Sequence, residues 1–265
     1  MNVYISYFKE EVFECVQNYN NINIINNGKV KEDKVMNLRY IYHSGFYLEM
    51  EDCAMVFDYY KGEIPEMDKS KKLFVFVSHE HGDHYNKKIF NIFKDYNVSF
   101  ILSDDIETKE KVDDLNIVFL SPHQECHIEG ITVKTLKSTD EGLAFIIEVE
   151  GKTIYHSGDL NWWTWKGFES EEEYNLMTEN FKSEIEHIKG LNIDLAMAVL
   201  DYRQKERYDW GLKYLLENAN IKYLVPMHCW DKYDIIDKFR EEHKDLLKNT
   251  ILVNTNKIGK EGVLI

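Results

Sequence analysis

Short apolar segments recur along the chain, and their spacing predicts a mixture of strands and helices. Residues 73–77 form an uninterrupted apolar run, which is typical of a buried strand. Between Tyr174 and Ile188 apolar residues recur every three or four positions, which predicts an amphipathic helix. The same criteria predict strands over 37–42, 46–49, 54–58, 73–77, 131–136, 144–149, 152–155, 195–200 and 223–225, and helices over 89–96, 174–188 and 236–246. Strands dominate early and mix with helices later, so we expect a layered protein with helices outside sheets.

The beginning of the chain differs from the rest in composition. Asparagines crowd the segment from Asn18 to Asn27, and Gly28 closes it. Residues 7–17, which precede this segment, predict a short helix. We therefore expect residues 1–35 to be an N-terminal extension packed on a main domain of residues 36–265.

Composition and charge exclude several classes of protein. The chain has 265 residues, 44% of them hydrophobic and 30% charged, as expected for a soluble domain with its own core. Its net charge of −15 disfavours nucleic acid and anionic membranes as partners. No apolar stretch reaches the roughly eighteen residues of a membrane span, and we see no secretory signal. The cysteines form no CxxC pair, so we expect reduced thiols in a cytoplasmic protein.

A cluster of metal-binding residue types directly follows the strand at 73–77. The segment reads Ser78-His79-Glu80-His81-Gly82-Asp83-His84. His79 and His81 are two residues apart, so extended backbone directs both imidazoles to one side. Gly82 then allows a turn before Asp83 and His84. Because neutral imidazoles with a carboxylate suit zinc, iron or manganese, the segment predicts a site for a divalent metal.

This segment is similar to the signature of the metallo-β-lactamase superfamily, and the resemblance covers most of residues 36–265. Tyr155-His156-Ser157-Gly158-Asp159 resembles the family's strand followed by a Gly-Asp turn, and Pro226-Met227-His228 resembles its late strand end. The resemblance implies an α+β fold, a four-layered αββα sandwich, with the metal site in a cleft between the sheet ends.

The resemblance also implies roles for these residues. It gives two metal positions with a shared aspartate: His79 and His81 for the first, Asp83, His84 and His228 for the second, and Asp159 between them. In such a site a zinc-type ion lowers the pKa of its bound water to about 7, which yields a hydroxide nucleophile. Asp83 would also orient this nucleophile or relay its proton, as the catalytic residue.

One ligand of the family pattern is missing. The family supplies a third histidine to the first metal, whereas the matching stretch here is Lys137-Ser138-Thr139-Asp140-Glu141-Gly142. Three explanations stay open: Asp140 replaces the histidine, the upstream His123 or His127 reaches in, or the first position is weak and the protein binds one metal. We favour Asp140 or an empty position over the upstream histidines. A solvated aspartate in a turn is an equal alternative for Asp140.

Further candidates for the cleft lie at other strand ends. His43, in His43-Ser44-Gly45-Phe46, resembles a motif of the branch that includes ascorbate-phosphate lactonase-like proteins, and it lies either at the cleft or within the sheet. Asp58 ends a strand and either holds a metal-binding histidine or caps a turn. Asp201 and Arg203 follow another strand and either lie at the cleft, where they bind an anionic substrate group or support a metal ligand, or form a surface ion pair.

These observations predict a metal-dependent hydrolase. We expect a metal-bound hydroxide to attack a small anionic ester, lactone or phosphodiester. The expected cofactor is one or two divalent ions, zinc first, with iron or manganese as alternatives. Nucleic acid as a substrate is disfavoured by the negative charge. The alternative is a metal-binding module of the same fold with little catalysis, which acts as a sensor or partner protein.

Overall fold

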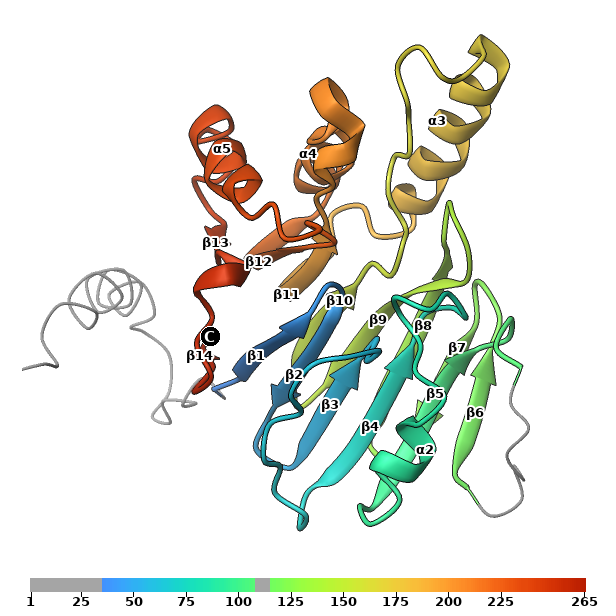
Figure 1. Ribbon diagram of the computed structural model, residues 1–265, viewed down its shortest axis with the longest axis vertical. Helices are drawn as coiled ribbons and strands as arrows, with labels where there is room; N and C mark the ends of the chain where they lie inside the picture. Colours follow the sequence, from blue (N-terminus) through green and yellow to red (C-terminus); the bar gives the residue numbers. More distant parts are fainter. Residues whose placement is uncertain (1–34, 108–114) are drawn as a thin grey trace, which may run out of the picture. The chain divides into compact units, whose positions relative to one another are not determined.

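Figure 1 shows a computed structural model of the chain, which describes residues 35–107 and 115–265. The chain divides into a unit of residues 1–33 and a unit of residues 34–265. The predicted extension of residues 1–35, with its helix over 7–17, lies outside the described residues except for Val35. The architecture below is therefore that of the second unit.

Within the described residues, two sheets of seven strands each form this unit. The first has the order β14-β1-β2-β3-β4-β5-β6. β1, β2 and β3 form an antiparallel meander, whereas β3 to β6 run parallel. Its strands are β1 Asn37–Tyr42, β2 Gly45–Glu49, β3 Cys53–Phe57, β4 Lys72–Val77, β5 Val98–Ser103, β6 Ile117–Leu120 and β14 Val263–Leu264.

The second sheet has the order β13-β12-β11-β10-β9-β8-β7. β7 to β10 are antiparallel, and β10 to β13 are parallel. Glu150 and Gly151 link β9 to β10 with φ angles of 49° and 77°, as a two-residue hairpin turn with two positive φ angles requires. The strands are β7 Glu125–Ile128, β8 Ile131–Lys137, β9 Leu143–Val149, β10 Lys152–His156, β11 Asn192–Val199, β12 Asn220–Met227 and β13 Ile251–Leu252.

Helices cover the outer face of each sheet (Figure 1). α3, α4 and α5 pack on the second sheet, and α2 packs on the first. Their bounds are α2 Ile89–Ile92, α3 Glu171–Glu186, α4 Trp210–Asn218 and α5 Asp234–Glu242, with short 3-10 helices η2 Tyr202–Arg207 and η3 Thr255–Lys257. Among the described helices none is both long and apolar enough to cross a membrane.

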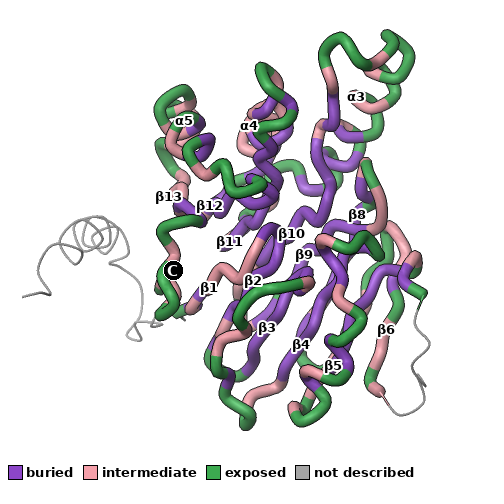
Figure 2. The backbone as a smooth tube through the Cα atoms, in the orientation of Figure 1, coloured by how far each residue is buried: buried purple, intermediate pink, exposed green. Residues whose placement is uncertain are grey.

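Three apolar clusters hold these layers together. One lies between the sheets and includes Phe46, Phe74 and Phe145, and two more join each sheet to its helices. In Figure 2 the strands are largely buried, and exposed residues follow the outer sides of the helices and the loops. This arrangement confirms the predicted α+β fold, the four-layered αββα sandwich.

The structure differs from the predicted elements at several places. The predicted helix over 89–96 is too long, because α2 ends at Ile92 and a separate turn follows, closed by the Tyr96 N to Phe93 O hydrogen bond of 3.0 Å. Apolar residues spaced three or four positions apart fit a helix and a pair of turns equally well, because both conformations bring such residues to the same side of the segment. The last predicted helix also ends early, at Glu242. The sequence pattern predicts no element at β5, β6, β7, α4, β13 or β14.

Candidate active site

The candidate site lies where strand ends of both sheets meet. In the first sheet, Asp58 directly follows β3, and the segment 78–84 follows β4. In the second sheet, Asp159, Asp201 and His228 follow β10, β11 and β12. Parallel strands place their carboxyl ends at the same edge of a sheet, so side chains from distant parts of the sequence gather there.

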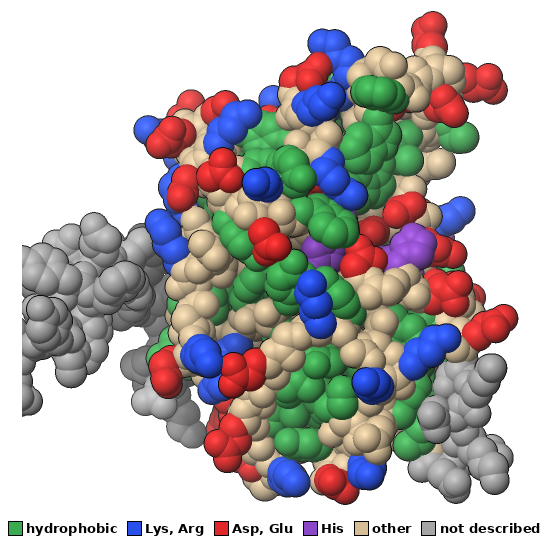
Figure 3. Space-filling view, in the orientation of Figure 1, with side chains coloured by type: hydrophobic (Ala, Val, Ile, Leu, Met, Phe, Trp, Pro, Cys, Tyr) green, Lys and Arg blue, Asp and Glu red, His purple; other side chains and the backbone are tan. Residues whose placement is uncertain are grey.

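A cleft of about 620 Å³ opens at this edge. It is lined by polar and charged groups together with several aromatic rings. In Figure 3 histidine side chains reach the surface among acidic ones near the middle of the face shown. The polar lining includes His81, Asp83, Asp140, Asp159, Arg203 and His228.

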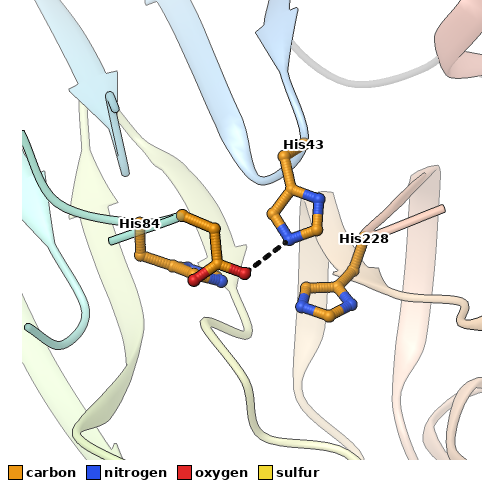
Figure 4. Close-up of side chains that lie close together, drawn as sticks. His43, His84 and His228 are labelled. Carbon is orange, nitrogen blue, oxygen red and sulfur yellow. Dashed lines mark ion pairs between the residues drawn. The ribbon is translucent and has the colours of Figure 1, made fainter. Parts of the chain in front are cut away.

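Potential ligand atoms at this cleft form three overlapping groups, and within each group the atoms lie within 4.8 Å of one another. Figure 4 shows three histidines of the first group, which come from different elements and approach one another. The groups are His43 with Asp83, His84 and His228; His79 with His84 and Asp159; and His81 with Asp140 and Asp159. The structure thus brings the six predicted metal ligands together and adds His43 and Asp140 to them.

Asp159 occupies the centre of this arrangement. Its Oδ1 lies 3.2 Å from His84 Nε2 and 3.5 Å from His228 Nε2, and its Oδ2 lies 3.7 Å from His79 Nε2. His43 Nε2 lies 3.5 Å from an Asp83 carboxylate oxygen, the pair marked by the dashed line in Figure 4. A carboxylate in the position of Asp159 can contact two neighbouring ions.

Apart from the ion-pair contacts given above, several of these atoms are buried and form no hydrogen bond among the described residues. They are His43 Nε2, His79 Nε2, His84 Nε2 and Asp159 Oδ1. Leaving a buried polar atom unpaired costs about 1–3 kcal/mol, so folded proteins rarely tolerate such a group of them without a ligand. Imidazole nitrogens and a carboxylate oxygen directed at one point are what a divalent ion binds, so the donor set fits a metal.

Asp58 orients two of the histidines. His84 Nδ1 donates to its Oδ2 across 2.8 Å, which directs Nε2 toward Asp159 and the cleft. Ser78 Oγ also donates to Oδ2, across 2.7 Å, and therefore accepts from His79 Nδ1 at 2.9 Å. One buried carboxylate thus fixes the tautomer of both rings, as in the carboxylate–histidine pairs of metal sites.

Asp201 does the same for His228. It accepts from His228 Nδ1 across 2.9 Å and from Arg203 Nε across 2.9 Å. Asp201 is fully buried and also pairs with Arg203, so it supports a histidine from behind, whereas the partly exposed Arg203 lines the cleft. The burial of Asp201 follows from its position at the end of the buried strand β11, beneath the cleft.

Burial and neighbouring charges set the protonation of the cluster. Burial, with the nearby His84, lowers the pKa of His79 to about 4, and burial with His228 and His84 lowers that of His43 to about 2. Both imidazoles are therefore neutral at pH 7. Burial alone would also lower the pKa of His84, but Asp159 and Asp58 outweigh it and raise that pKa well above the usual value. Burial alone would raise the pKa of Asp159, but His84 and His228 hold it well below the usual value.

The backbone is strained at two of the histidines. His43 and His228 have φ angles of 58° and 64°, in the left-handed region that non-glycine residues rarely adopt. Each costs on the order of 1–3 kcal/mol, and such outliers cluster at functional sites. Tyr40 Oη accepts from His43 N across 2.7 Å, and His43 O accepts from His228 N across 3.3 Å. The two strained turns therefore stabilise each other.

The other end of the cleft is more open. The His81 side chain is 45% exposed, and its Nε2 lies 2.8 Å from a Glu141 carboxylate oxygen. Asp140 lies with His81 and Asp159 in the third group, and burial together with Asp159 raises its pKa. His123 and His127 pair instead with Glu184 and Glu125, so neither contacts this group.

Two glycines allow the loops of the site to approach closely. A Cβ on Gly142 would lie 2.0 Å from Ser78 O, and one on Gly158 would lie 2.4 Å from Leu143 O. Both residues have positive φ, 70° and 48°. Leu143 N donates to Ser78 O across 2.9 Å, which joins the loop carrying Asp140 to the histidine segment.

Sequence reasoning missed the supporting roles of Ser78 and Tyr40. Ser78 stands inside the motif, at the strand end, where its short hydroxyl side chain was a usable signal. No local pattern marks Tyr40, because its hydroxyl reaches His43 only through the irregular turn after β1.

A family model described as the beta-lactamase superfamily domain matches residues 37–172, slightly more than half of the chain. The chain therefore belongs to the metallo-β-lactamase superfamily. A UPF0173 metal-dependent hydrolase from Alkaliphilus metalliredigens (strain QYMF) is 27% identical over 141 residues, 47% of this chain and 63% of that protein. The match thus spans less than two thirds of that relative's length.

Solved structures share the fold. A metallo hydrolase from the archaeon Ignicoccus hospitalis aligns with a TM-score of 0.60 at 15% identity, over 87% of this chain and 97% of that one. The diiron β-hydroxylase CmlA from Streptomyces venezuelae aligns with a TM-score of 0.52 at 9% identity, over 86% of this chain and 54% of that one. Because these two carry different chemistry, the fold alone does not fix the reaction.

Proposed function

We propose that this protein is a metal-dependent hydrolase that acts on a small anionic ester, lactone or phosphodiester. The observation that carries the proposal is the convergence of buried, unpartnered imidazole nitrogens and a carboxylate oxygen on one cleft. His84 and His228 each donate Nδ1–H to a buried carboxylate, so their Nε2 atoms are directed at the cleft, where a metal ion would bind. The names of the relatives from Alkaliphilus metalliredigens and Ignicoccus hospitalis support the same class.

One or two divalent ions, zinc first and iron or manganese as alternatives, suit this donor set. His43, Asp83, His84 and His228 form the group that would hold one ion, and the two groups that share Asp159, one with His79 and the other with His81 and Asp140, supply the residues that would hold a second. When bound, such an ion supplies an activated water near neutral pH and a positive charge for the developing oxyanion. The second position has the weaker support, because His81 and Asp140 are exposed.

Asp83 is the residue we assign to proton handling. It lines the cleft, and its side chain is 30% exposed, so it can contact solvent and substrate. A carboxylate in that position accepts a hydrogen bond from the attacking water, orients it and takes up its proton. His84, in contrast, is buried and held by Asp58, which suits a ligand.

Arg203 is the residue we assign to the anionic group of the substrate. It lines the cleft, and Asp201 fixes its guanidinium through Nε and Nη2. The guanidinium carbon lies 4.7 Å from the centre of the Trp230 ring, which supports its plane. A guanidinium held in this way presents a fixed positive charge to a carboxylate or phosphate.

The cleft also offers apolar surface. Trp163 and Trp165 stack on each other with centroids 6.0 Å apart and planes 7° apart, and both line the cleft. The acidic Glu169 beside them is engaged by Arg207 and by the Trp165 backbone N. We therefore expect a substrate with an anionic group near Arg203 and an apolar part against the tryptophans.

The test uses the full-length protein and a panel of substrates: a chromogenic phosphodiester, an aryl ester with a carboxylate, the matching neutral ester, and a lactone. We expect turnover of an anionic member, its loss on exhaustive chelation, and recovery on return of metal. Arg203→Ala should raise KM about tenfold for the anionic ester and leave the neutral ester unchanged.

Activity that survives chelation would contradict the proposal. Bound metal with no turnover of any panel member would favour the alternative, a sensor or partner module of the same fold.

A further inference from the structure

A second cluster of ligand-type side chains lies away from the cleft. His123 lies in the turn between β6 and β7, and Glu184 and His187 lie three residues apart at the end of α3, on one side of the helix. Each offers one ligand atom, and the three atoms lie within 4.8 Å of one another. None of the three lines the cleft.

Glu184 is an unusual carboxylate for a surface helix. Its side chain is only 9% exposed, although α3 begins and ends with exposed acidic residues. Both oxygens lie 3.0 Å from His123 Nε2, and Oε2 accepts from Lys137 N across 3.1 Å. Glu186, the last residue of α3, forms an ordinary exposed pair with Lys189, three residues further along the chain. Glu184, in contrast, lies beside the imidazoles of His123 and His187.

His123 and His187 lie close enough together to bind the same ion. Their ring centroids lie 4.9 Å apart, and both residues are exposed, so solvent and ions reach them. His123 has a φ angle of 61°, in the left-handed region, and its N donates to Thr135 O across 3.1 Å. This turn directs the ring toward Glu184 at a conformational cost, which a bound ligand would offset.

We propose that His123, Glu184 and His187 bind a divalent metal ion, zinc by its donor set, at a site separate from the cleft. Two imidazole nitrogens and one carboxylate oxygen form a common set of protein ligands for zinc, with water in the fourth position. The ion links the β6–β7 turn to the end of α3. Because Glu184 also accepts from Lys137 N, it also holds the end of β8, where the loop with Asp140 begins. This site does not depend on the proposed hydrolase function.

The test measures zinc bound to the full-length protein after dialysis against buffered micromolar free zinc. We expect His123→Ala, His187→Ala and Glu184→Gln each to bind one zinc equivalent less than the wild type. His84→Ala, at the cleft, should lose zinc there but keep the equivalent at this cluster, so a double variant with His187→Ala should bind one zinc equivalent less than His84→Ala alone. The matched control is His127→Ala, which removes an exposed histidine of the adjoining strand that pairs with Glu125.

Thermal unfolding supplies the second readout, because an ion that binds only the folded chain raises Tm. In the His84→Ala background, zinc should raise Tm, and the added His187→Ala change should reduce that rise while leaving the Tm without zinc unchanged. Equal zinc content in the wild type and all three cluster variants would overturn the proposal and leave an ordinary His123–Glu184 ion pair. A zinc-dependent rise in Tm of equal size with and without His187→Ala would overturn it as well.

Discussion

The two ends of the cleft are built in different ways. At the buried end, Asp58 and Asp201 hold His84 and His228 through Nδ1, and both rings are almost inaccessible to solvent. At the exposed end, His81 is 45% exposed and pairs with Glu141. The buried end is organised before a ligand arrives, whereas the exposed end loses side-chain freedom when it binds one. A preorganised set of donors should therefore bind metal more tightly than the exposed set.

Removing His84 should have the largest effect. His84 belongs to two of the three ligand groups at the cleft, and its loss removes one hydrogen-bond donor to Asp58 and the imidazole nitrogen 3.2 Å from Asp159. We expect His84→Ala to lower turnover of any hydrolysed panel substrate by about 1,000-fold or more, with a loss of cleft metal. The measurements are kcat/KM and metal per chain.

His127→Ala is the control for that change, since it removes an exposed histidine that lies outside the cleft groups. Its turnover should equal that of the wild type. If the His84→Ala protein retains near wild-type turnover, the buried end of the cleft is not the part on which activity depends, and the contrast between the two ends has no functional meaning.

The approach of the two loops should be the next most sensitive feature. A methyl group on Gly142 would lie 2.0 Å from Ser78 O, so Gly142→Ala must push the Asp140 loop away from the histidine segment. We expect a loss of about 3 kcal/mol in the free energy of unfolding, from the strained φ and the clash together. Denaturant unfolding checks this value.

Gly151→Ala separates the two causes. Gly151 has a similar φ of 77°, but a Cβ there meets nothing within 4 Å. It should therefore cost only about 1 kcal/mol, the contribution of backbone strain. Equal losses for both variants would show that the close contact at Gly142 contributes nothing.

The sequence predicts the layers of the fold more fully than the details of the site. Continuous apolar runs such as 73–77 identify buried strands, because a strand covered on both faces has no polar side. Short segments such as α2 escape this reasoning, because one helical turn and a sequence of tight turns share the same apolar spacing. β13 and β14 have only two residues each, too few to show any period.

For the site, the sequence identified the ligand-type residues and offered Asp58 as a support, but it did not show the other contacts that hold them. The contact of Asp201 with His228 spans 27 residues, and that of His43 N with the Tyr40 hydroxyl depends on one irregular turn. Burial of Asp201 follows from the stacking of the sheets, which no local pattern records. Supporting contacts of this kind arise from tertiary packing, so they become visible only with the fold.

Changing the support of the buried end should have an intermediate effect. Asp201→Asn keeps the shape of the side chain but removes the charge that holds His228 Nδ1–H and Arg203. We expect metal affinity at the buried end to fall about 10–100-fold, the usual result when a carboxylate behind a metal-binding histidine is lost. Competition with a chelator of known affinity measures it, and an unchanged affinity would show that His228 needs no support from Asp201.

The smallest effect should come from the exposed end. Asp140 contributes one carboxylate oxygen to the group with His81 and Asp159. We expect Asp140→Ala to remove about one metal equivalent at this end, with a change of no more than about tenfold in the affinity of the buried end. Glu141→Ala is the matched control, because this neighbouring carboxylate pairs with His81 but lies outside the ligand group. If Asp140→Ala and Glu141→Ala both retain full metal content, Asp140 is a solvated turn residue and the cleft holds its metal at the buried end. Asp140→Ala could instead lower the metal affinity of the buried end more than Asp201→Asn does. The exposed carboxylate would then organise the whole cluster, and the buried end would not be the preorganised one.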